Sequence, residues 1–135
     1  MALKPELASR ADIERLVDAF YQQVQADDLL GPIFNDVANV DWSAHLPRMY
    51  DFWESVLFGA PAFKGNPLSV HRLLARQAAM TEREFGRWIA LFEATVDGLF
   101  SGPVAQEAKT RASRIASVMQ FNIAEDARAA GRQTP

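Results

Sequence analysis

Apolar residues recur along the chain at steps of three and four positions, and strict alternation of apolar and polar residues never holds for long. The step of three and four is typical of amphipathic helices, whereas alternation is typical of half-buried strands. The pattern therefore predicts an all-α protein of about five helices with short connections. Only the two ends, residues 1–8 and about 127–135, are predicted to be loose polar tails.

The first predicted helix begins at Ser9, a good N-cap, and Asp12 stands where a carboxylate complements the free backbone amides. Gly31-Pro32 stops the apolar pattern, and Ile33 and Phe34 follow as an apolar plug in a turn. The buried face is predicted to carry Tyr21 beside an apolar stripe, which consists of Ile13, Leu16, Val17, Phe20 and Val24.

The second predicted helix covers about residues 43–58 and ends at Gly59-Ala60-Pro61. Proline is tolerated in a first turn but breaks a helix interior, so Pro47 indicates that the regular helix begins close to His45. The residues expected to face inward are Leu46, Met49, Tyr50, Phe52, Trp53, Val56 and Leu57.

Three more helices are predicted in the second half of the chain. Asn66-Pro67 begins a short helix whose stripe is Leu68, His71, Leu74, Ala75 and Ala78. Thr81 and Glu84 form a capping box for a long helix with Phe85, Trp88, Ile89, Phe92, Val96, Leu99 and Phe100 inward. After Gly102-Pro103, the last helix uses Val104, Ala108, Ala112, Ile115, Met119 and Ile123. An antiparallel bundle and a globin-like packing around a ligand both satisfy these patterns.

Composition excludes several classes of protein. The 135 residues suit one domain, and 14 Lys+Arg against 17 Asp+Glu give a net charge of −3, which does not favour nucleic-acid binding. The absence of cysteine excludes disulfides, thiol catalysis and cysteine-ligated metals. No apolar run approaches the ~20 residues of a membrane span, and the N-terminus lacks the pattern of a secretory signal. The expected class is a cytoplasmic domain.

The chain has two histidines. His71 lies on the apolar stripe of its predicted helix, where an imidazole nitrogen needs a hydrogen-bond acceptor or a metal. A core histidine bonded to a backbone carbonyl is the commoner explanation for such a position. By the same reasoning, His45 alone would be a cap or surface residue, and Tyr21 and Trp88 would be ordinary core residues.

Most catalytic motifs are missing from the chain, including short-spaced zinc ligands, a serine elbow and phosphate-binding glycine patterns. What is left is one histidine on an apolar stripe, with a second histidine, a tyrosine and a tryptophan elsewhere. Haem uses this arrangement, because one imidazole binds its iron while polar donors on the other side tune the open position. Its apolar walls would come from Phe34, Met49, Phe52, Leu68, Leu74, Phe92 and Met119.

An ordered set of short motifs resembles the truncated haemoglobins, and most closely their third group. The matching segments are Phe20-Tyr21, Gly31-Pro32-Ile33-Phe34, Trp42-x-x-His45, Phe52-Trp53, Gly65-Asn66-Pro67-x-x-x-His71 and Phe85-x-x-Trp88-x-x-Leu91-Phe92. No single motif is specific to this family, but the combination of all of them in this order is. The resemblance implies a two-over-two helical sandwich around haem b (iron protoporphyrin IX).

The resemblance also implies roles for individual residues. His71 matches the proximal ligand of the haem iron, and Tyr21, His45 and Trp88 match the distal polar residues. Phe34 matches the phenylalanine that wedges against the porphyrin edge. Met49 matches a residue above the porphyrin face. Arg48 resembles a basic residue that binds a haem propionate. Other candidates for binding the propionate are Lys64, Arg72 and Arg76.

These roles favour reversible binding of dioxygen, carbon monoxide or nitric oxide, with oxygen transport among the expected uses. Two polar donors predict slow release of dioxygen, which suits a reagent or sensor better than a bulk carrier. The alternative is redox catalysis at the same haem, either nitric oxide dioxygenation with an unidentified reductase or peroxide turnover. No acidic residue lies within one helical turn of His71, which counts against peroxide chemistry. A haem-free helical interaction domain is the third hypothesis.

Overall fold

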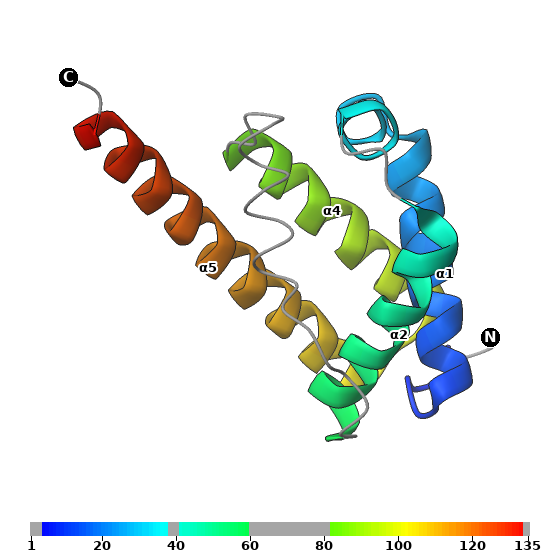
Figure 1. The fold of residues 1–135 in the computed structure, drawn as a ribbon. Helices are drawn as coiled ribbons and strands as arrows, with labels where there is room; N and C mark the ends of the chain where they lie inside the picture. Colours follow the sequence, from blue (N-terminus) through cyan, green and yellow to red (C-terminus); the bar gives the residue numbers. More distant parts are fainter. Residues whose placement is uncertain (1–3, 38–40, 60–81, 134–135) are drawn as a thin grey trace.

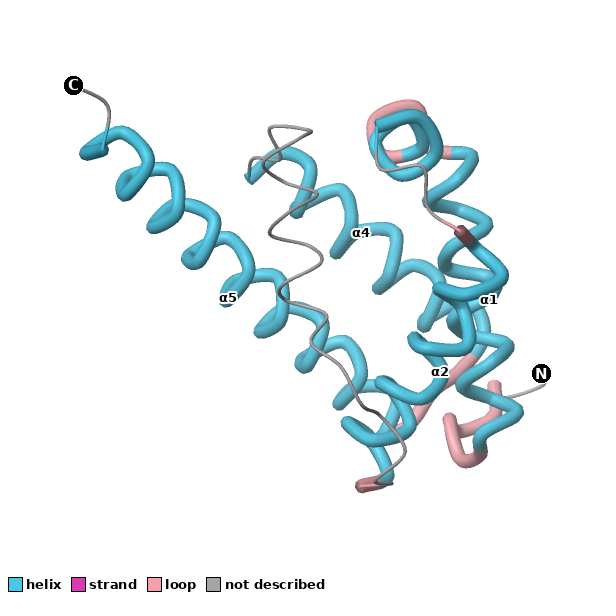
Figure 2. Tube along the Cα trace, in the orientation of Figure 1, coloured by secondary structure: helices cyan, strands magenta, loops and turns pink. Residues whose placement is uncertain are grey.

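The computed structural model describes residues 4–37, 41–59 and 82–133 of the chain. Its helices are α1 (Arg10–Ala26), α2 (Trp42–Phe58), α4 (Glu82–Leu99) and α5 (Pro103–Gln133), with a short π-helical turn, η1 (Ile33–Val37), between α1 and α2. Every element within these ranges is helical, which confirms the all-α prediction (Figure 2). The predicted short helix with Leu68, His71 and Leu74 lies outside the described residues, as do Lys64, Arg72 and Arg76.

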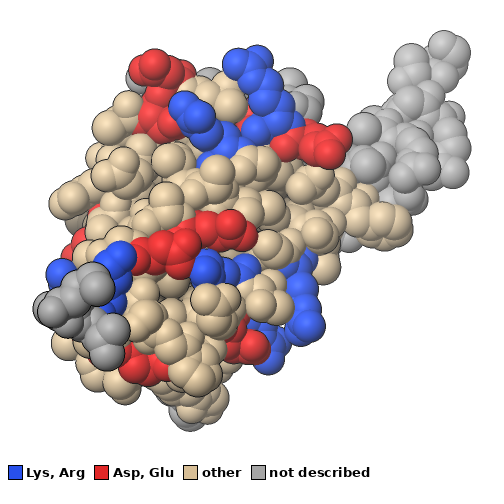
Figure 3. Space-filling view, turned by 180° about the vertical axis from the view of Figure 1, so that it is seen from behind, with Lys and Arg blue, Asp and Glu red and all other residues tan. Residues whose placement is uncertain are grey.

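The helices form two pairs that pack on one another (Figure 1). α4 and α5 run antiparallel along each other, α1 and α2 form the second pair, and α1 also packs against α4. On the face seen in Figure 3, acidic and basic side chains are interspersed over the described surface, so neither sign of charge dominates it. The core between the pairs includes Leu16, Phe20, Val24, Phe34, Trp53, Phe85, Phe92, Val96, Ala108 and Ala112.

α1 begins as the sequence predicts. The Ser9 hydroxyl accepts a hydrogen bond from the Asp12 backbone amide at 3.2 Å, and the Asp12 carboxylate accepts one from the Ser9 amide at 3.2 Å. This reciprocal capping box satisfies two of the free amides at the helix start. All five residues of the predicted stripe are buried, and Tyr21 is buried with them.

α2 begins earlier than expected, at Trp42 rather than close to His45. The reason is an N-cap at Asp41, whose carboxylate accepts from the Ser43 amide at 3.2 Å and whose carbonyl accepts from the His45 amide at 2.8 Å. Pro47 lies inside this helix, not in its first turn. The helix ends at Gly59, which adopts the left-handed conformation (φ 71°) typical of a C-terminal glycine.

The segment before α1 is not the loose tail that its polarity predicts. Leu7 is fully buried, and the Glu6 carboxylate accepts hydrogen bonds from the Val104 and Ala105 amides at 3.1 and 2.9 Å. Burial alone would raise the pKa of Glu6, but these backbone bonds outweigh it and lower the pKa. Gly102 (φ 116°) allows this cap, since a Cβ there would meet the Glu6 carboxylate.

The other predicted tail is also structured, because α5 continues to Gln133. Its last turns, residues 123–133, contain four alanines and two arginines, which have high helix propensity. Amphipathic spacing is therefore not needed to extend the helix, and the sequence pattern underestimates its length.

We expect Glu6→Gln to lower the free energy of unfolding by about 0.5 kcal/mol at pH 7, because the ionised carboxylate caps α5. A lowered pKa means that this stabilisation is present above the ordinary value of 4.5 and is lost as the pH falls through the lower folded-state pKa. Urea unfolding of both proteins at several pH values would measure the difference. A difference that does not shrink below pH 4.5 would contradict the assignment.

A matched control is Glu107→Gln. Glu107 pairs with Arg111 one turn along the exposed surface of α5, at 2.7 Å. Such exposed pairs contribute about 0.3 kcal/mol, so this variant should unfold almost as the wild-type protein does.

Candidate functional site

Tyr21, Trp42 and His45 form one group of mutually contacting rings, which we call the three-ring group. Tyr21 comes from α1, and the other two come from the first turn of α2. The centroids of Tyr21 and His45 lie 5.0 Å apart with the rings nearly perpendicular (83°). Trp42 lies 5.4 Å from Tyr21 and 5.6 Å from His45. The structure thus brings together two of the three predicted distal residues.

Trp88, the third predicted distal residue, connects to this group through Phe20. Phe20 lies 4.9 Å from the Tyr21 ring and 5.4 Å from the Trp88 ring, which it meets edge-on at 87°. Trp88 is only 8% exposed and lies parallel to Phe92, at a centroid distance of 5.9 Å. A continuous run of rings therefore joins His45 on α2 to Trp88 on α4.

The polar atoms of these side chains are held in apolar surroundings. Tyr21 is 3% exposed, and burial raises the pKa of its hydroxyl, so the group stays protonated and able to donate. Among the described residues, none forms a hydrogen bond with the Tyr21 hydroxyl or the Trp88 indole N–H. The Nε2 atom of His45 is shielded from solvent. A hydroxyl or N–H in apolar surroundings needs an acceptor, which a small ligand beside the Tyr21 hydroxyl and the Trp88 indole would supply.

The predicted apolar walls are buried or half-buried where the structure describes them. Phe34, Met49, Phe92 and Met119 are buried, and Phe52 is half-buried with its ring 5.5 Å from Trp53. Sequence reasoning missed Trp42 as a site residue. The signal was present, since a position three residues before His45 lies one turn earlier on the same side of a helix.

Arg48 is exposed on α2, one turn after His45. A hydrogen bond from Ser43 lowers the pKa of Asp41, and the charge of Arg48 contributes to the same lowering. The expected contact of Arg48 with a haem propionate stays a prediction.

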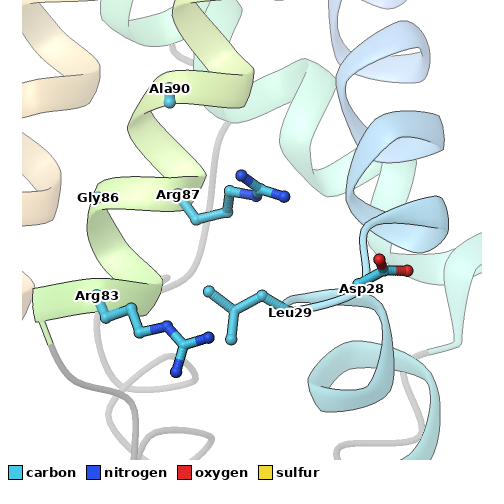
Figure 4. A pocket seen from close by; sticks show the side chains of 6 residues that line it. All are labelled: Asp28, Leu29, Arg83, Gly86, Arg87 and Ala90. Atoms are coloured by element: carbon cyan, nitrogen blue, oxygen red, sulfur yellow. The ribbon is translucent and has the colours of Figure 1, made fainter.

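A pocket of about 500 Å³ opens elsewhere on the surface, between the end of α1 and the first turns of α4 (Figure 4). It is lined by Asp28, Leu29, Arg83, Gly86, Arg87 and Ala90. The side chains of Arg83 and Leu29 extend toward each other, and Arg87 pairs with Asp27 at 2.7 Å. These α4 positions lie on the face opposite Trp88 and Phe92, so this pocket is separate from the run of rings.

The donor set around the three-ring group fits a haem with a small ligand. Haem needs large apolar walls and polar donors beside the open position of its iron, and Tyr21, Trp88 and His45 are such donors. Within the described ranges, the core holds no buried charged side chain and no group of three His, Cys, Asp or Glu that could chelate a bare metal ion.

Comparison with known proteins agrees with this chemistry. The sequence profile of the bacterial-like globin family matches residues 6–124. This chain belongs to the bacterial-like globin family. A curated relative of the globin is the group 3 truncated hemoglobin ctb of Campylobacter jejuni, 30% identical over 121 residues, which span 87% of this chain and 93% of the relative.

Solved structures give the fold of this globin. The crystal structure of a group III truncated hemoglobin from Campylobacter jejuni matches with a TM-score of 0.77 and 29% identity, covering 90% of this chain and 95% of the other. Chlamydomonas reinhardtii THB1 matches with a TM-score of 0.61 and 32% identity, covering 83% and 87%. The fold is therefore the two-over-two truncated globin fold, and membership of the family implies a haem cofactor. None of the described helices of the globin is long and apolar enough to cross a membrane.

We expect the folded globin to form little tyrosinate at about pH 10.5, although an ordinary tyrosine has a pKa near 10. Burial raises the pKa of Tyr21, and burial with a hydrogen bond to Asp18 raises that of Tyr50 to about 12. Ultraviolet difference absorbance during alkaline titration measures this directly. The unfolded chain should titrate both tyrosines near pH 10.

The Tyr50→Phe variant leaves Tyr21 as the one tyrosine of the chain, since the sequence has two. Its folded form should show no ionisation step until the protein itself unfolds in alkali. A step near pH 10 in this variant would mean that the Tyr21 hydroxyl is in contact with solvent.

Proposed function

We propose that this globin reversibly binds dioxygen, or another diatomic ligand such as carbon monoxide or nitric oxide, at a haem b ligated by His71. When bound, the haem supplies a ferrous iron with one open coordination position. The observation that carries the proposal is the contact of the buried Tyr21 ring with His45, in a family of haem proteins. His71 enters through the resemblance of its segment to the proximal motif of truncated haemoglobins.

The side chains of this chain would act on the ligand in two ways. Tyr21 would donate its hydroxyl proton to the ligand, and its raised pKa keeps that proton in place across the physiological range. Trp88 would donate its indole N–H from α4. The buried rings of Phe34 and Phe92 would keep bulk water away, which strengthens both hydrogen bonds. Each such bond contributes about 1.4 kcal/mol, so two donors favour tight binding and slow release.

The haem and its ligation are tested by absorption spectra of the purified globin before and after dithionite and carbon monoxide. We expect a haem band that responds to both reagents in the wild-type protein. In His71→Ala the band should be lost or altered, and added imidazole should restore it in part. A colourless protein that takes up no added haemin would contradict the proposal, and an unchanged His71→Ala spectrum would contradict the ligand.

The role of Tyr21 is tested by the rate of dioxygen dissociation. We expect Tyr21→Phe to raise this rate about tenfold, because one lost hydrogen bond of ~1.4 kcal/mol corresponds to that factor. Stopped-flow displacement by carbon monoxide measures the rate.

Tyr50→Phe is the matched control. It removes the same atom from the other tyrosine, whose hydroxyl donates to Asp18 and not to the three-ring group. This variant should release dioxygen at the wild-type rate. Equal rates in all three proteins would exclude Tyr21 as the main donor.

A further inference from the structure

We propose that Trp42 and Asn35 are positioning residues that hold His45 and Tyr21 in their mutual orientation. The inference rests on the proposed function, because it concerns the two side chains expected beside the ligand. It assigns a role to residues that need not touch the ligand themselves. Its basis is a chain of contacts that joins the end of α1, the turn η1 and the first turn of α2.

Trp42 contacts rings from three elements at once. Its ring centroid lies 5.4 Å from Tyr21 of α1, 5.6 Å from His45 of α2 and 6.2 Å from Phe34 of η1. Residues three apart on a helix are neighbours, so Trp42 lies directly against the His45 side chain within α2. The interplanar angle between these two rings is 83°, so one ring presents its edge to the face of the other.

Asn35 fixes the orientation of this indole from outside α2. The Trp42 Nε1–H donates to Asn35 Oδ1 at 3.3 Å, and Asn35 Nδ2 donates to the Gln25 carbonyl at 3.4 Å. An indole has one N–H, so the position of its acceptor sets the direction of the whole ring. Asn35 thus links the last turn of α1 to the first turn of α2 through its two amide atoms.

The consequence concerns the freedom of His45. Its imidazole is held between Tyr21 and Trp42, so rotation toward the start of α2 requires the indole to move. While the indole is bonded to Asn35, that movement is opposed. Without the bond, the indole has more rotamers, and the imidazole and the Tyr21 ring gain alternative orientations with it. We therefore expect Asn35 and Trp42 to limit the number of orientations that the His45 and Tyr21 side chains adopt beside a ligand.

The first experiment measures the hydrogen bond itself and does not depend on haem. Nuclear magnetic resonance can follow hydrogen exchange of the indole N–H groups of the chain's three tryptophans, in the apoprotein and in the haem-loaded protein. In Asn35→Ala we expect exchange at Trp42 to be about tenfold faster, the factor for one lost bond of ~1.4 kcal/mol. Trp53 and Trp88 serve as internal references and should not change.

Asn35→Asp is the conservative comparison, since it keeps the acceptor for Trp42 and loses the donor to Gln25. Exchange at Trp42 should stay close to the wild-type rate in this variant. Asn35 is exposed, so neither substitution removes a core side chain. Equal exchange at Trp42 in the wild-type protein and Asn35→Ala would overturn the proposed bond.

The second experiment measures the orientation of the donors. The C–O stretching band of the ferrous carbon monoxide form reports the polar groups beside the ligand. In Trp42→Phe, which keeps a ring but removes the N–H, and in Asn35→Ala, we expect the band to broaden or split. Tyr50→Phe is the control, because the Tyr50 hydroxyl donates to Asp18 and not to the three-ring group. It should leave the band unchanged.

The two proposals fail in different ways. If wild-type protein takes up no haem or carbon monoxide, the proposed function fails, while the exchange experiment still decides the Asn35–Trp42 bond. If the wild-type protein binds carbon monoxide and its band is identical in Trp42→Phe and Asn35→Ala, the function stands and the positioning role is overturned.

Discussion

The packing of Phe20 against α4 is the contact on which the candidate site depends. Its ring lies 5.4 Å from Trp88 and 5.2 Å from Phe92, edge-on to both. Such aromatic pairs stabilise by about 1 kcal/mol each beyond the area that they bury. Consecutive residues on an α-helix point about 100° apart, so turning Phe20 into α4 directs Tyr21 toward the start of α2. One contact in the core therefore determines which element the Tyr21 ring faces.

The corner after α1 is also bonded to α4, and it positions Phe34. The Asp27 carboxylate accepts from the Leu29 and Leu30 amides at 3.0 and 2.9 Å and from Arg87 at 2.7 Å. Burial alone would raise the pKa of Asp27, but these bonds lower it. The corner is thereby tied to α4, and the chain enters η1 with Phe34 buried beside Trp42. A Cβ on Gly31 would lie 2.6 Å from the Gln25 carbonyl, so only glycine fits this approach.

The parts of this globin that the sequence predicts are those decided within a few residues. The capping box of Ser9 and Asp12 and the stripe around Phe20 follow from local spacing, and the buried position of Tyr21 follows with them. Contacts between distant segments were not predictable in this way. Glu6 caps a helix 98 residues away, and no local pattern distinguishes it from the other carboxylates of the sequence. The three-ring group is predictable only in part. The contact between Trp42 and His45 follows from their spacing of one helical turn, but their contact with Tyr21 depends on how α1 and α2 cross.

Pro47 explains why the orientation of His45 needs support from outside its own helix. Proline has no N–H and cannot donate to the carbonyl four residues earlier, so it weakens the hydrogen bonding of the turn that contains His45. The backbone of such a turn is less rigid, so it restricts the orientation of the His45 side chain less. The structure nevertheless holds its ring edge-on against Tyr21 and Trp42. We infer that Tyr21 and Trp42, with Asn35 bonded to the indole, supply this support, so α2 can contain Pro47 without losing the geometry of the site.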